Sequence, residues 1–416
     1  MAQLTDDCFA FGGALMPVED AVRIIAANIA PVAAIETVDV AMADDRVLAG
    51  NIAAPIDLPP YTNSAVDGYA VRLDDLAETE TLPIAGRSAA GDISTASLKP
   101  GAAWRIFTGA RLPEGADTVF MQEDVQLDES GRVHFPSGLR HGANTRARGE
   151  DLRAGAIALP SGRILRPQDL AIAAGLGLRK LPVRKPVRLA LFSTGDEVAE
   201  PGTKLTPGRL YDANRALLAS MARRAGAEVT DLGILADDPD TIASALRDAV
   251  RTHDLILTSG GVSTGEADYM RRTIETLGTL VFWRLAIKPG RPVAMGMIDG
   301  TPLIGLPGNP VAAFVTFVHV ARPLIAALAG TTLPPRMALP VRAGFTWRKK
   351  AGRREYLRVR LTRTEDGEPV AHKHPQDGAG ILTSLTETDG LAELAEPVTT
   401  VGPGDYVGYL PYDVLF

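Results

Sequence analysis

Apolar residues repeat with helical spacing near the start of the chain and with strand spacing near its end. Residues 18–29 place alanine, valine and isoleucine every three or four positions after two early acids, which predicts an amphipathic helix. Residues 355–361 alternate instead, with Leu357, Val359 and Leu361 on one face of a predicted strand. The chain therefore combines helical and strand-rich parts.

The middle of the chain alternates between short apolar runs and amphipathic segments. The predicted strands are residues 187–192, 228–235, 255–258 and 303–306, and the predicted helices are residues 214–225, 239–252, 267–277 and 310–328. Asp238 and Pro239 are typical of a helix N-cap and first position. This series predicts a three-layer α/β domain with a mostly parallel sheet.

The segments on both sides of this series have a different pattern. Three prolines at positions 55, 59 and 60 mark a boundary, and short strands separated by glycine and proline follow. Residues 128–131 form a predicted hairpin turn. We expect a β-rich domain at residues 55–151, the α/β domain at 186–330 and a small C-terminal β-barrel at 331–416.

Composition and charge narrow the functional class. A chain of 416 residues with 46% hydrophobic and 22% charged residues is typical of a globular protein with several domains. The net charge of −7 argues against nucleic acid as a partner. The single cysteine, Cys8, allows no internal disulfide, and we find no signal peptide and no apolar run of membrane-spanning length. We expect a cytoplasmic protein without a membrane partner.

Two glycine-containing loops follow predicted strands and open predicted helices. Ser259, Gly260 and Gly261 form the first loop, and Pro307, Gly308 and Asn309 form the second. Glycine lets a backbone approach a ligand, and a helix N-terminus attracts anions, so both loops indicate a phosphate site. The alternative for the second loop is an ordinary helix cap made by Asn309.

Three cations lie within eight residues, with no acid among them. In an extended segment Arg284, Ala286 and Lys288 share one face, and the turn at Pro289 keeps Arg291 close. This arrangement suits an oxyanion clamp. A solvated edge of the domain is the alternative.

Several carboxylates follow strands or glycines and are candidate metal ligands. In the α/β series these are Glu197 with Asp196, then Asp237, which precedes the Asp238 cap, and Asp268, at a predicted helix start. Such oxygen ligands suit Mg²⁺ next to a phosphate. The alternatives are an acid that favours the helix dipole at Asp268 and ordinary turn residues at Asp67 and Asp151, outside the α/β series.

Eight motifs occur in an order that resembles the molybdopterin molybdotransferases, the MoeA family, and also the E domain of gephyrin. They are SAVDGYA (64–70), IFTGARLPEGADTVFMQED (106–124), RGEDL (148–152), STGDE (193–197), ADDP (236–239), SGGVSTGEADY (259–269), LAIKPGRP (285–292) and GLPGNP (305–310). Other nucleotide or metal signatures, such as a P-loop, GxGxxG, HExxH or CxxC, are absent from the sequence.

The resemblance implies a homodimer whose discontinuous N-terminal domain comprises residues 1–54 and 152–185. It implies that adenylylated molybdopterin and molybdate give molybdenum cofactor and AMP with Mg²⁺, the pterin being supplied by an adenylyltransferase. The site residues that it implies are Asp67, Thr108, Asp151, Glu197, Asp237, Asp268, Arg284, Lys288 and Arg358. Of these, Arg358 is expected to reach the site across the dimer, and Asp67 is a second candidate for such a contact.

Two departures from the family pattern and two other functions remain to be weighed. The family counterparts of Arg284 and Arg291 are commonly lysines, and a small hydroxyl residue often stands where Ala379 is found. A gephyrin-like scaffold without catalysis could lose the acids and cations, which are present here. A hydrolase that acts on a nucleotide would not need the motifs around Asp67 and Thr108.

Overall fold

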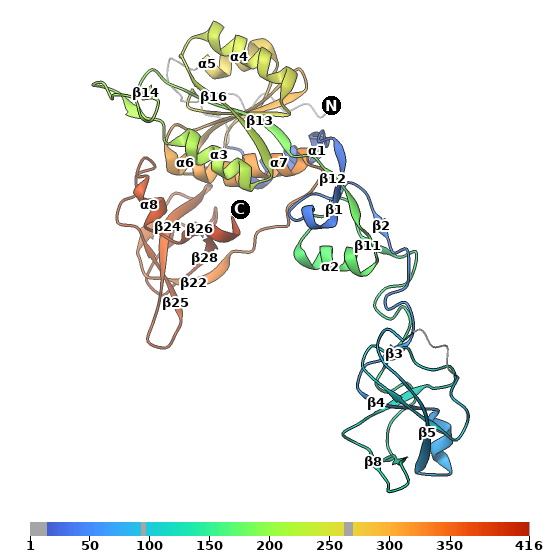
Figure 1. Ribbon diagram of the computed structural model, residues 1–416. Helices are drawn as coiled ribbons and strands as arrows, with labels where there is room; N and C mark the ends of the chain where they lie inside the picture. Colours follow the sequence, from blue (N-terminus) through green and yellow to red (C-terminus); the bar gives the residue numbers. More distant parts are fainter. Residues whose placement is uncertain (1–14, 93–96, 262–268, 416) are drawn as a thin grey trace. The chain divides into compact units, whose positions relative to one another are not determined.

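The computed structural model describes residues 15–92, 97–261 and 269–415 (Figure 1). The chain divides into two compact units. The first comprises Met1–Glu36, Asp45–Ala49 and Pro182–Phe416, and the second comprises Thr37–Asp44 and Gly50–Leu181. The predicted positions of Cys8 and Asp268 lie outside the described residues.

A mixed six-stranded sheet forms the α/β part of the first unit. Its order is β16 (Ala227–Leu235), β13 (Val187–Thr194), β17 (Leu255–Ser259), β21 (Thr301–Leu306), β20 (Pro292–Ile298) and β18 (Thr279–Arg284). The first four strands are parallel, and β20 and β18 are antiparallel to their neighbours. Because the parallel strands end at one edge, the loops that follow them gather there.

Helices cover both faces of this sheet (Figure 1). Leu189 and Leu191 pack toward α1 (Val18–Asn28), α3 (Asn214–Arg224) and the apolar helix Pro310–Leu328. Ala190 and Phe192 pack toward α4 (Pro239–Thr252) and α5 (Tyr269–Leu277). Strand β13 is therefore apolar on both faces, as a buried parallel strand requires. The predicted three-layer arrangement is confirmed.

The apolar helix Pro310–Leu328 differs from the sequence expectation. It consists of α6 (Pro310–Thr316), the π-turn η4 (Phe317–Ala321) and α7 (Arg322–Leu328). Its 19 residues, with a mean hydropathy of 1.9, are enough to cross a membrane, although no such run was expected from the sequence. Since 83% of its most apolar window is buried inside the protein, the structure explains this helix as a core element.

The C-terminal part is a closed five-stranded barrel, as expected. The hydrogen-bonded order is β24 (Arg354–Arg363), β25 (Pro369–Lys373), β22 (Leu339–Ala343), β28 (Tyr406–Pro411) and β26 (Gly390–Leu394), and β26 pairs again with β24. The short strand β19 (Ile287–Lys288) of the α/β part pairs with β24. This pairing fixes the segment of the three predicted cations, residues 284–291 (the cation segment), against the barrel.

Short elements complete the first unit. They are β14 (Val198–Ala199), β15 (Leu210–Tyr211), β23 (Trp347–Arg348), β27 (Thr400–Val401), α8 (Thr383–Thr386) and η5 (Tyr412–Val414). Strands β1 (Ile35–Asp39) and β12 (Lys180–Arg184) contain two of the four points where the chain passes between the units.

The second unit contains a sheet of six strands. Its order is β7 (Thr118–Met121), β4 (Gly68–Val71), β6 (Ala103–Ile106), β5 (Thr81–Ser88), β9 (Arg132–His134) and β8 (Gln126–Leu127). The predicted hairpin at 128–131 joins β8 to β9. The remaining elements are η2 (Val40–Met42), β2 (Ile52–Ala53), β3 (Asn63–Ser64), η3 (Leu73–Ala77), β10 (Thr145–Arg146), β11 (Ile157–Leu159) and α2 (Pro167–Gly175).

Candidate functional site

The two predicted glycine loops lie next to each other at the edge where the parallel strands end. The side-chain amide of Asn214, at the start of α3, donates to Ser259 Oγ at 2.8 Å and to the Gly308 carbonyl at 2.7 Å. The Gly260 N–H donates to the Leu306 carbonyl at 3.1 Å. One buried amide therefore joins both loops, and sequence reasoning did not single it out.

Gly260 is required by the protein's own backbone. Its φ of +90° is unfavourable for other residues, and a Cβ there would lie 2.5 Å from the Thr194 carbonyl. The glycines were expected to make room for a ligand. The structure gives Gly260 a reason that needs no ligand, namely close packing against the end of β13.

Three carboxylates gather at the ends of β13 and β16. Burial raises the pKa of Asp237, and the neighbouring charges of Asp196 and Glu197 raise it further. Like charges this close repel one another, and a bound cation would relieve the repulsion. The structure thus brings Glu197 and Asp237 together, as the metal prediction requires.

The donor chemistry of this cluster fits Mg²⁺, but the cluster is not a closed cage. Within the described ranges, no group of three His, Cys, Asp or Glu side chains has a geometry that would hold a metal ion. Mg²⁺ usually keeps several waters and needs only one or two carboxylates beside a substrate phosphate. Glu197 and Asp237 would suit that role.

Two of the three predicted cations line a cavity of about 300 Å³ between the α/β part and the barrel. Lys288 and Arg291 contribute from one side, Pro307 and Asn309 from the second glycine loop, and Arg358 from the barrel. Arg284 ends β18 and is not among the residues that line this cavity. The clamp in this cavity therefore consists of Lys288 and Arg291, without the third expected cation.

One expectation about this segment is wrong. Alternation placed Ala286 on the same face as the cations, yet its exposed fraction is only 2%, and Leu285 and Ile287 are buried as well. The Ala286 N–H donates to the Met16 carbonyl, and the Ala286 carbonyl accepts from the Arg354 N–H. The segment is thus enclosed on both sides between β18 and β19, and simple alternation fails there.

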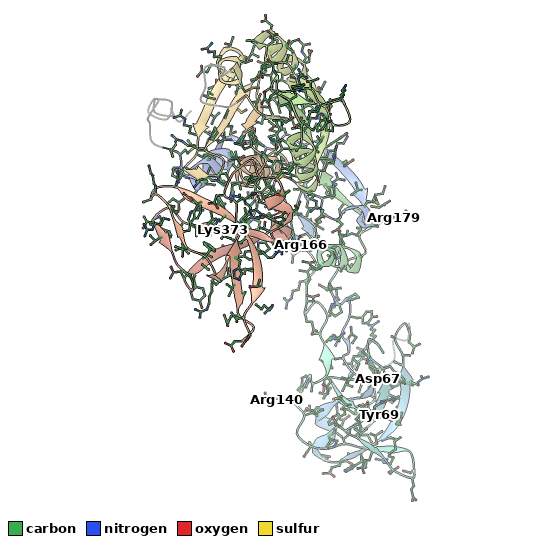
Figure 2. All side chains as sticks on the ribbon, turned by 90° about the vertical axis from the view of Figure 1, so that its left-hand side faces the viewer. Asp67, Tyr69, Arg140, Arg166, Arg179 and Lys373 are labelled. Atoms are coloured by element: carbon green, nitrogen blue, oxygen red, sulfur yellow. The ribbon has the colours of Figure 1, made fainter. Side chains whose placement is uncertain are left out.

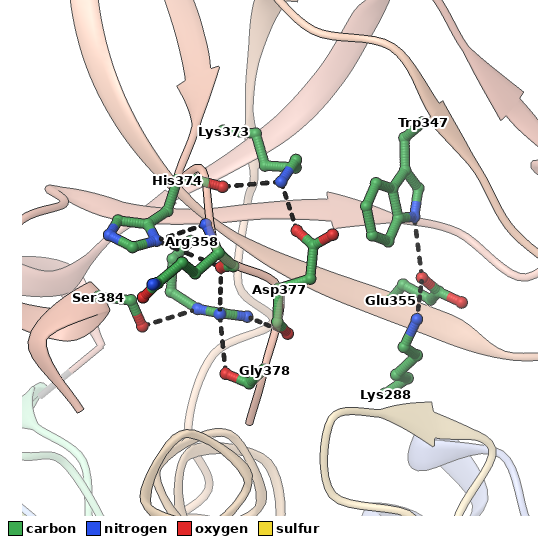
Figure 3. Close-up of polar contacts among 10 residues, drawn as sticks. Lys288, Trp347, Glu355, Arg358, Lys373, His374, Asp377, Gly378 and Ser384 are labelled. Atoms are coloured by element: carbon green, nitrogen blue, oxygen red, sulfur yellow. Dashed lines mark hydrogen bonds and ion pairs between the residues drawn. The ribbon is translucent and has the colours of Figure 1, made fainter. Parts of the chain in front are cut away.

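A buried carboxylate holds Lys288 in place (Figure 3). The side chain of Glu355 is 1% exposed and accepts from Trp347 Nε1 at 2.9 Å, Arg353 Nε at 2.8 Å and Lys288 Nζ at 3.5 Å. Lys288 and Lys373 also lie 5.2 and 5.3 Å from the Trp347 ring centroid. These contacts orient the Lys288 ammonium group at the cavity wall.

Arg358 lines the same cavity as Lys288 of its own chain, and its expected contribution across a dimer stays a prediction. Its guanidinium donates to Ser384 Oγ and to the carbonyls of Gln376 and Gly378 at 3.0 to 3.1 Å (Figure 3). Burial lowers the pKa of Arg358. Because its donors are engaged by the protein, its main visible role is to hold the loop at residues 376–380.

That loop fills part of the anion site expected at the helix N-terminus. The Val311 N–H, in the first turn of α6, donates to the Ala379 carbonyl at 3.0 Å. Asn309 occupies the N-cap position but makes no side-chain capping hydrogen bond. The expected asparagine cap is wrong, and a backbone carbonyl satisfies one first-turn N–H instead. The anion site at this helix start stays a prediction.

In the second unit, Asp67 and Thr108 form a direct pair (Figure 2 labels Asp67). Asp67 Oδ1 accepts from the backbone N–H and the hydroxyl of Thr108, both at 2.7 Å. These bonds lower the pKa of Asp67, and nearby Arg105 contributes to the shift. Asp151 is exposed elsewhere in the unit, and its backbone N–H donates to the Leu58 carbonyl at 3.1 Å.

Sequence reasoning missed Asn214, Trp347 and Glu355. A polar residue that opens a helix directly after a strand-end segment was a usable signal for Asn214. For Glu355, the signal was a carboxylate that shares strand parity with Leu357 and Val359, which places an acid on an apolar face.

Comparisons with known proteins agree along the chain. Family models match in order, as the MoeA N-terminal region (domain I and II) at residues 16–177, a "probable molybdopterin binding domain" at 190–327 and the MoeA C-terminal region (domain IV) at 340–412. A molybdopterin molybdenumtransferase of Haemophilus influenzae is 37% identical over 376 residues, which are 90% of this chain and 93% of that protein.

Two further comparisons extend the likeness. Molybdopterin molybdenumtransferase 2 of Mycobacterium tuberculosis is 34% identical over 388 residues, covering 88% of this chain and 93% of the relative. The crystal structure of a molybdopterin biosynthesis MoeA protein from Pyrococcus horikoshii has a TM-score of 0.81 at 28% identity, covering 96% of this chain and all of that one.

Proposed function

The chain belongs to the MoeA family and is a transferase of molybdenum cofactor biosynthesis, and we propose that it inserts molybdenum from molybdate into adenylylated molybdopterin with release of AMP. The observation that carries this proposal is the cavity that Lys288 and Arg291 line together with Pro307 and Asn309. Two cations at a polar loop suit an oxyanion substrate.

The cations would act by position and charge. Lys288 is held by Glu355 and Trp347, so it presents a fixed ammonium group to the oxygens of molybdate or of the phosphate link. Arg291 would add a planar fork of donors on the same side. Neutralising the substrate oxygens in this way lowers the cost of the charge that develops as AMP leaves, and no covalent nucleophile is required.

Mg²⁺ would be held by Glu197 and Asp237, with Asp268 as a further candidate ligand. When bound, the ion supplies charge neutralisation at the substrate phosphates. Burial, and then the charges of Asp196 and Glu197, raise the pKa of Asp237, and the nearness of these two charges supports a cation at this position. Ser259, Gly260, Gly261 and Gly308 would stand near the pterin phosphate, and Arg284 would add positive charge from the end of β18.

The second unit would supply Asp67, Thr108 and Asp151 to the reaction. The exposed Thr108 hydroxyl is oriented by Asp67, which supports a contact between this pair and a polar substrate group. We propose that these residues complete the site in a homodimer and that an adenylyltransferase delivers the pterin. We further propose a cytoplasmic location, with no nucleic acid or membrane partner, and keep the four-domain division given above.

The test is a reaction with purified protein, adenylylated molybdopterin, molybdate and Mg²⁺, in which AMP is followed by chromatography. We expect AMP to form only when molybdate and Mg²⁺ are both present. Lys288→Gln should slow AMP release at least 100-fold, because a charge contact in the transition state contributes about 3 kcal/mol. Lys99→Gln, an exposed lysine of the second unit, should leave the rate unchanged.

Two results would count against this function. AMP release that ignores molybdate would indicate a hydrolase. A protein that binds the pterin but never releases AMP, with or without Lys288, would indicate a scaffold.

A further inference from the structure

A second cavity of the first unit lies away from the site described above. It has a volume of about 650 Å³ and is bounded by α1, the helix from η4 to α7 and the linker at residues 331–336. Val18, Val22 and Ile25 give it an apolar wall. This volume falls in the range of small-molecule sites, which combine apolar walls with a few polar groups.

The polar groups of this cavity are strongly biased toward positive charge. Four arginines line it, at positions 23, 322, 336 and 354, and the acids that line it are Glu19 and Glu393. Both acids are engaged by Arg354, at 2.5 Å and 3.8 Å. They therefore leave Arg322 and Arg336 without an equally close counter-charge.

Arg322 and Arg336 are two neighbouring cations that are largely withdrawn from water. Burial, together with the charge of Arg322, lowers the pKa of Arg336 to about 10, against weaker opposite effects of Tyr356 and Glu393. Across the described ranges, no carboxylate forms an ion pair with either guanidinium. Burying like charges without a partner costs free energy, which a bound anion would recover.

His319 sits beside this pair and adds no charge. Its side chain is buried against the Tyr356 ring, with 4.4 Å between ring centroids. Arg336 Nη1 lies 3.4 Å from His319 Nδ1, and since arginine can only donate, Nδ1 is the acceptor and the proton is on Nε2. That Nε2 group is buried and has no hydrogen-bond partner. The environment of the arginines thus contains donors in excess.

We propose that this cavity binds a phosphomonoester carried on an apolar body, with Arg322 and Arg336 gripping the phosphate and the α1 wall covering the body. A phosphomonoester dianion matches two adjacent cations, whereas a carboxylate neutralises only one of them. Arg336 keeps one nitrogen on the Val318 carbonyl at 2.6 Å, so its direction is fixed before the ligand arrives. The site is separate from the cavity of Lys288 and is independent of the proposed reaction.

The experiment is calorimetric titration of the full chain with phenyl phosphate, inorganic phosphate and benzoate. We expect phenyl phosphate to bind at least ten times more tightly than either of the other two. Arg322→Gln should weaken phenyl phosphate at least ten-fold. Arg360→Gln is the matched control, because Arg360 is exposed and does not line this cavity, and its effect should stay below two-fold.

Two further arms distinguish this cavity from the cavity of Lys288, and ligand binding from a change in folding. Arg291→Gln alters the cavity of Lys288 and should leave the Arg322-dependent binding intact. Thermal unfolding separates binding from folding, because Arg322→Gln should unfold at the same or a higher temperature than the parent yet gain no stability from phenyl phosphate.

The proposal is overturned by three results. These are equal affinity in Arg322→Gln and the parent, equal affinity for benzoate and phenyl phosphate, and loss of binding only in Arg291→Gln. It is also overturned if phenyl phosphate does not bind and Arg322→Gln changes the oligomeric state in sedimentation, since a second copy of the chain would then provide the counter-charge.

Discussion

Replacing Glu355 by glutamine should loosen the barrel where it meets the cation segment. The carboxylate is fully buried and accepts from an indole N–H, a guanidinium and an ammonium group. Glutamine keeps the shape but loses the charge, and its amide nitrogen turns a donor toward donors. The change therefore leaves Arg353 and Lys288 without their shared counter-charge.

The expected cost follows from the burial of the three partners. Breaking a buried ion pair by removing one member costs about 3–5 kcal/mol when all charges are buried. Arg353 and Lys288 are 32% and 46% exposed, so water replaces part of the lost contact. We expect about 2–3 kcal/mol, which corresponds to roughly a 30- to 150-fold increase in the local opening equilibrium.

Hydrogen exchange measured on peptides of β24 is the suitable assay, because a chain with several compact parts does not unfold as one two-state system. Glu355→Gln should speed exchange in β24 by the stated factor. Glu365→Gln is the matched control, since Glu365 is exposed in the turn after the same strand. Exchange in β24 that is equally slow in the parent and both variants would refute the assigned role of Glu355.

Three further predictions concern single groups. Burial and neighbouring carboxylates raise the pKa of Asp237, so its charged form destabilises the folded protein, and Asp237→Asn should resist urea better than the parent at pH 7. This advantage should vanish as the pH falls below 3.8, and equal urea resistance at pH 7 would contradict the prediction. Hydrogen bonds from Thr108 lower the pKa of Asp67, so the Thr108 amide NMR signal should titrate with a midpoint below pH 3.8, and a midpoint above 3.8 would contradict the pairing. Arg358→Lys should increase proteolysis of the loop at 376–380 several-fold, because lysine cannot span its three acceptors, whereas Arg360→Lys, at an exposed position, should not.

Local sequence signals predicted much of the fold. The Asp238 cap is confirmed by its bond to the Thr241 N–H at 2.8 Å, and the helix that precedes Gly226 ends where glycine indicated it. The strict alternation of residues 355–361 correctly predicted a strand. It could not reveal that Tyr356 and Arg358 are also buried, because that face packs against a part of the chain far away in sequence.

The site was predicted where chemistry is local and missed where it depends on long-range contacts. Lys288 and Arg291 stand in one short motif, and the structure does bring them to one cavity. The carbonyl of Ala379 caps a helix that begins about seventy residues earlier, and no side-chain pattern announces a backbone carbonyl. Glu355 was overlooked because its partners Trp347 and Lys288 meet only when β19 pairs with β24.

The most direct test of the proposed reaction couples AMP release to cofactor delivery. The purified chain is given adenylylated molybdopterin, molybdate and Mg²⁺, and the product is passed to a molybdenum enzyme that lacks its cofactor. We predict one AMP for each recipient that becomes active, with both signals lost in Lys288→Gln. Activation of the recipient without AMP, or AMP without molybdate, would contradict the proposed reaction.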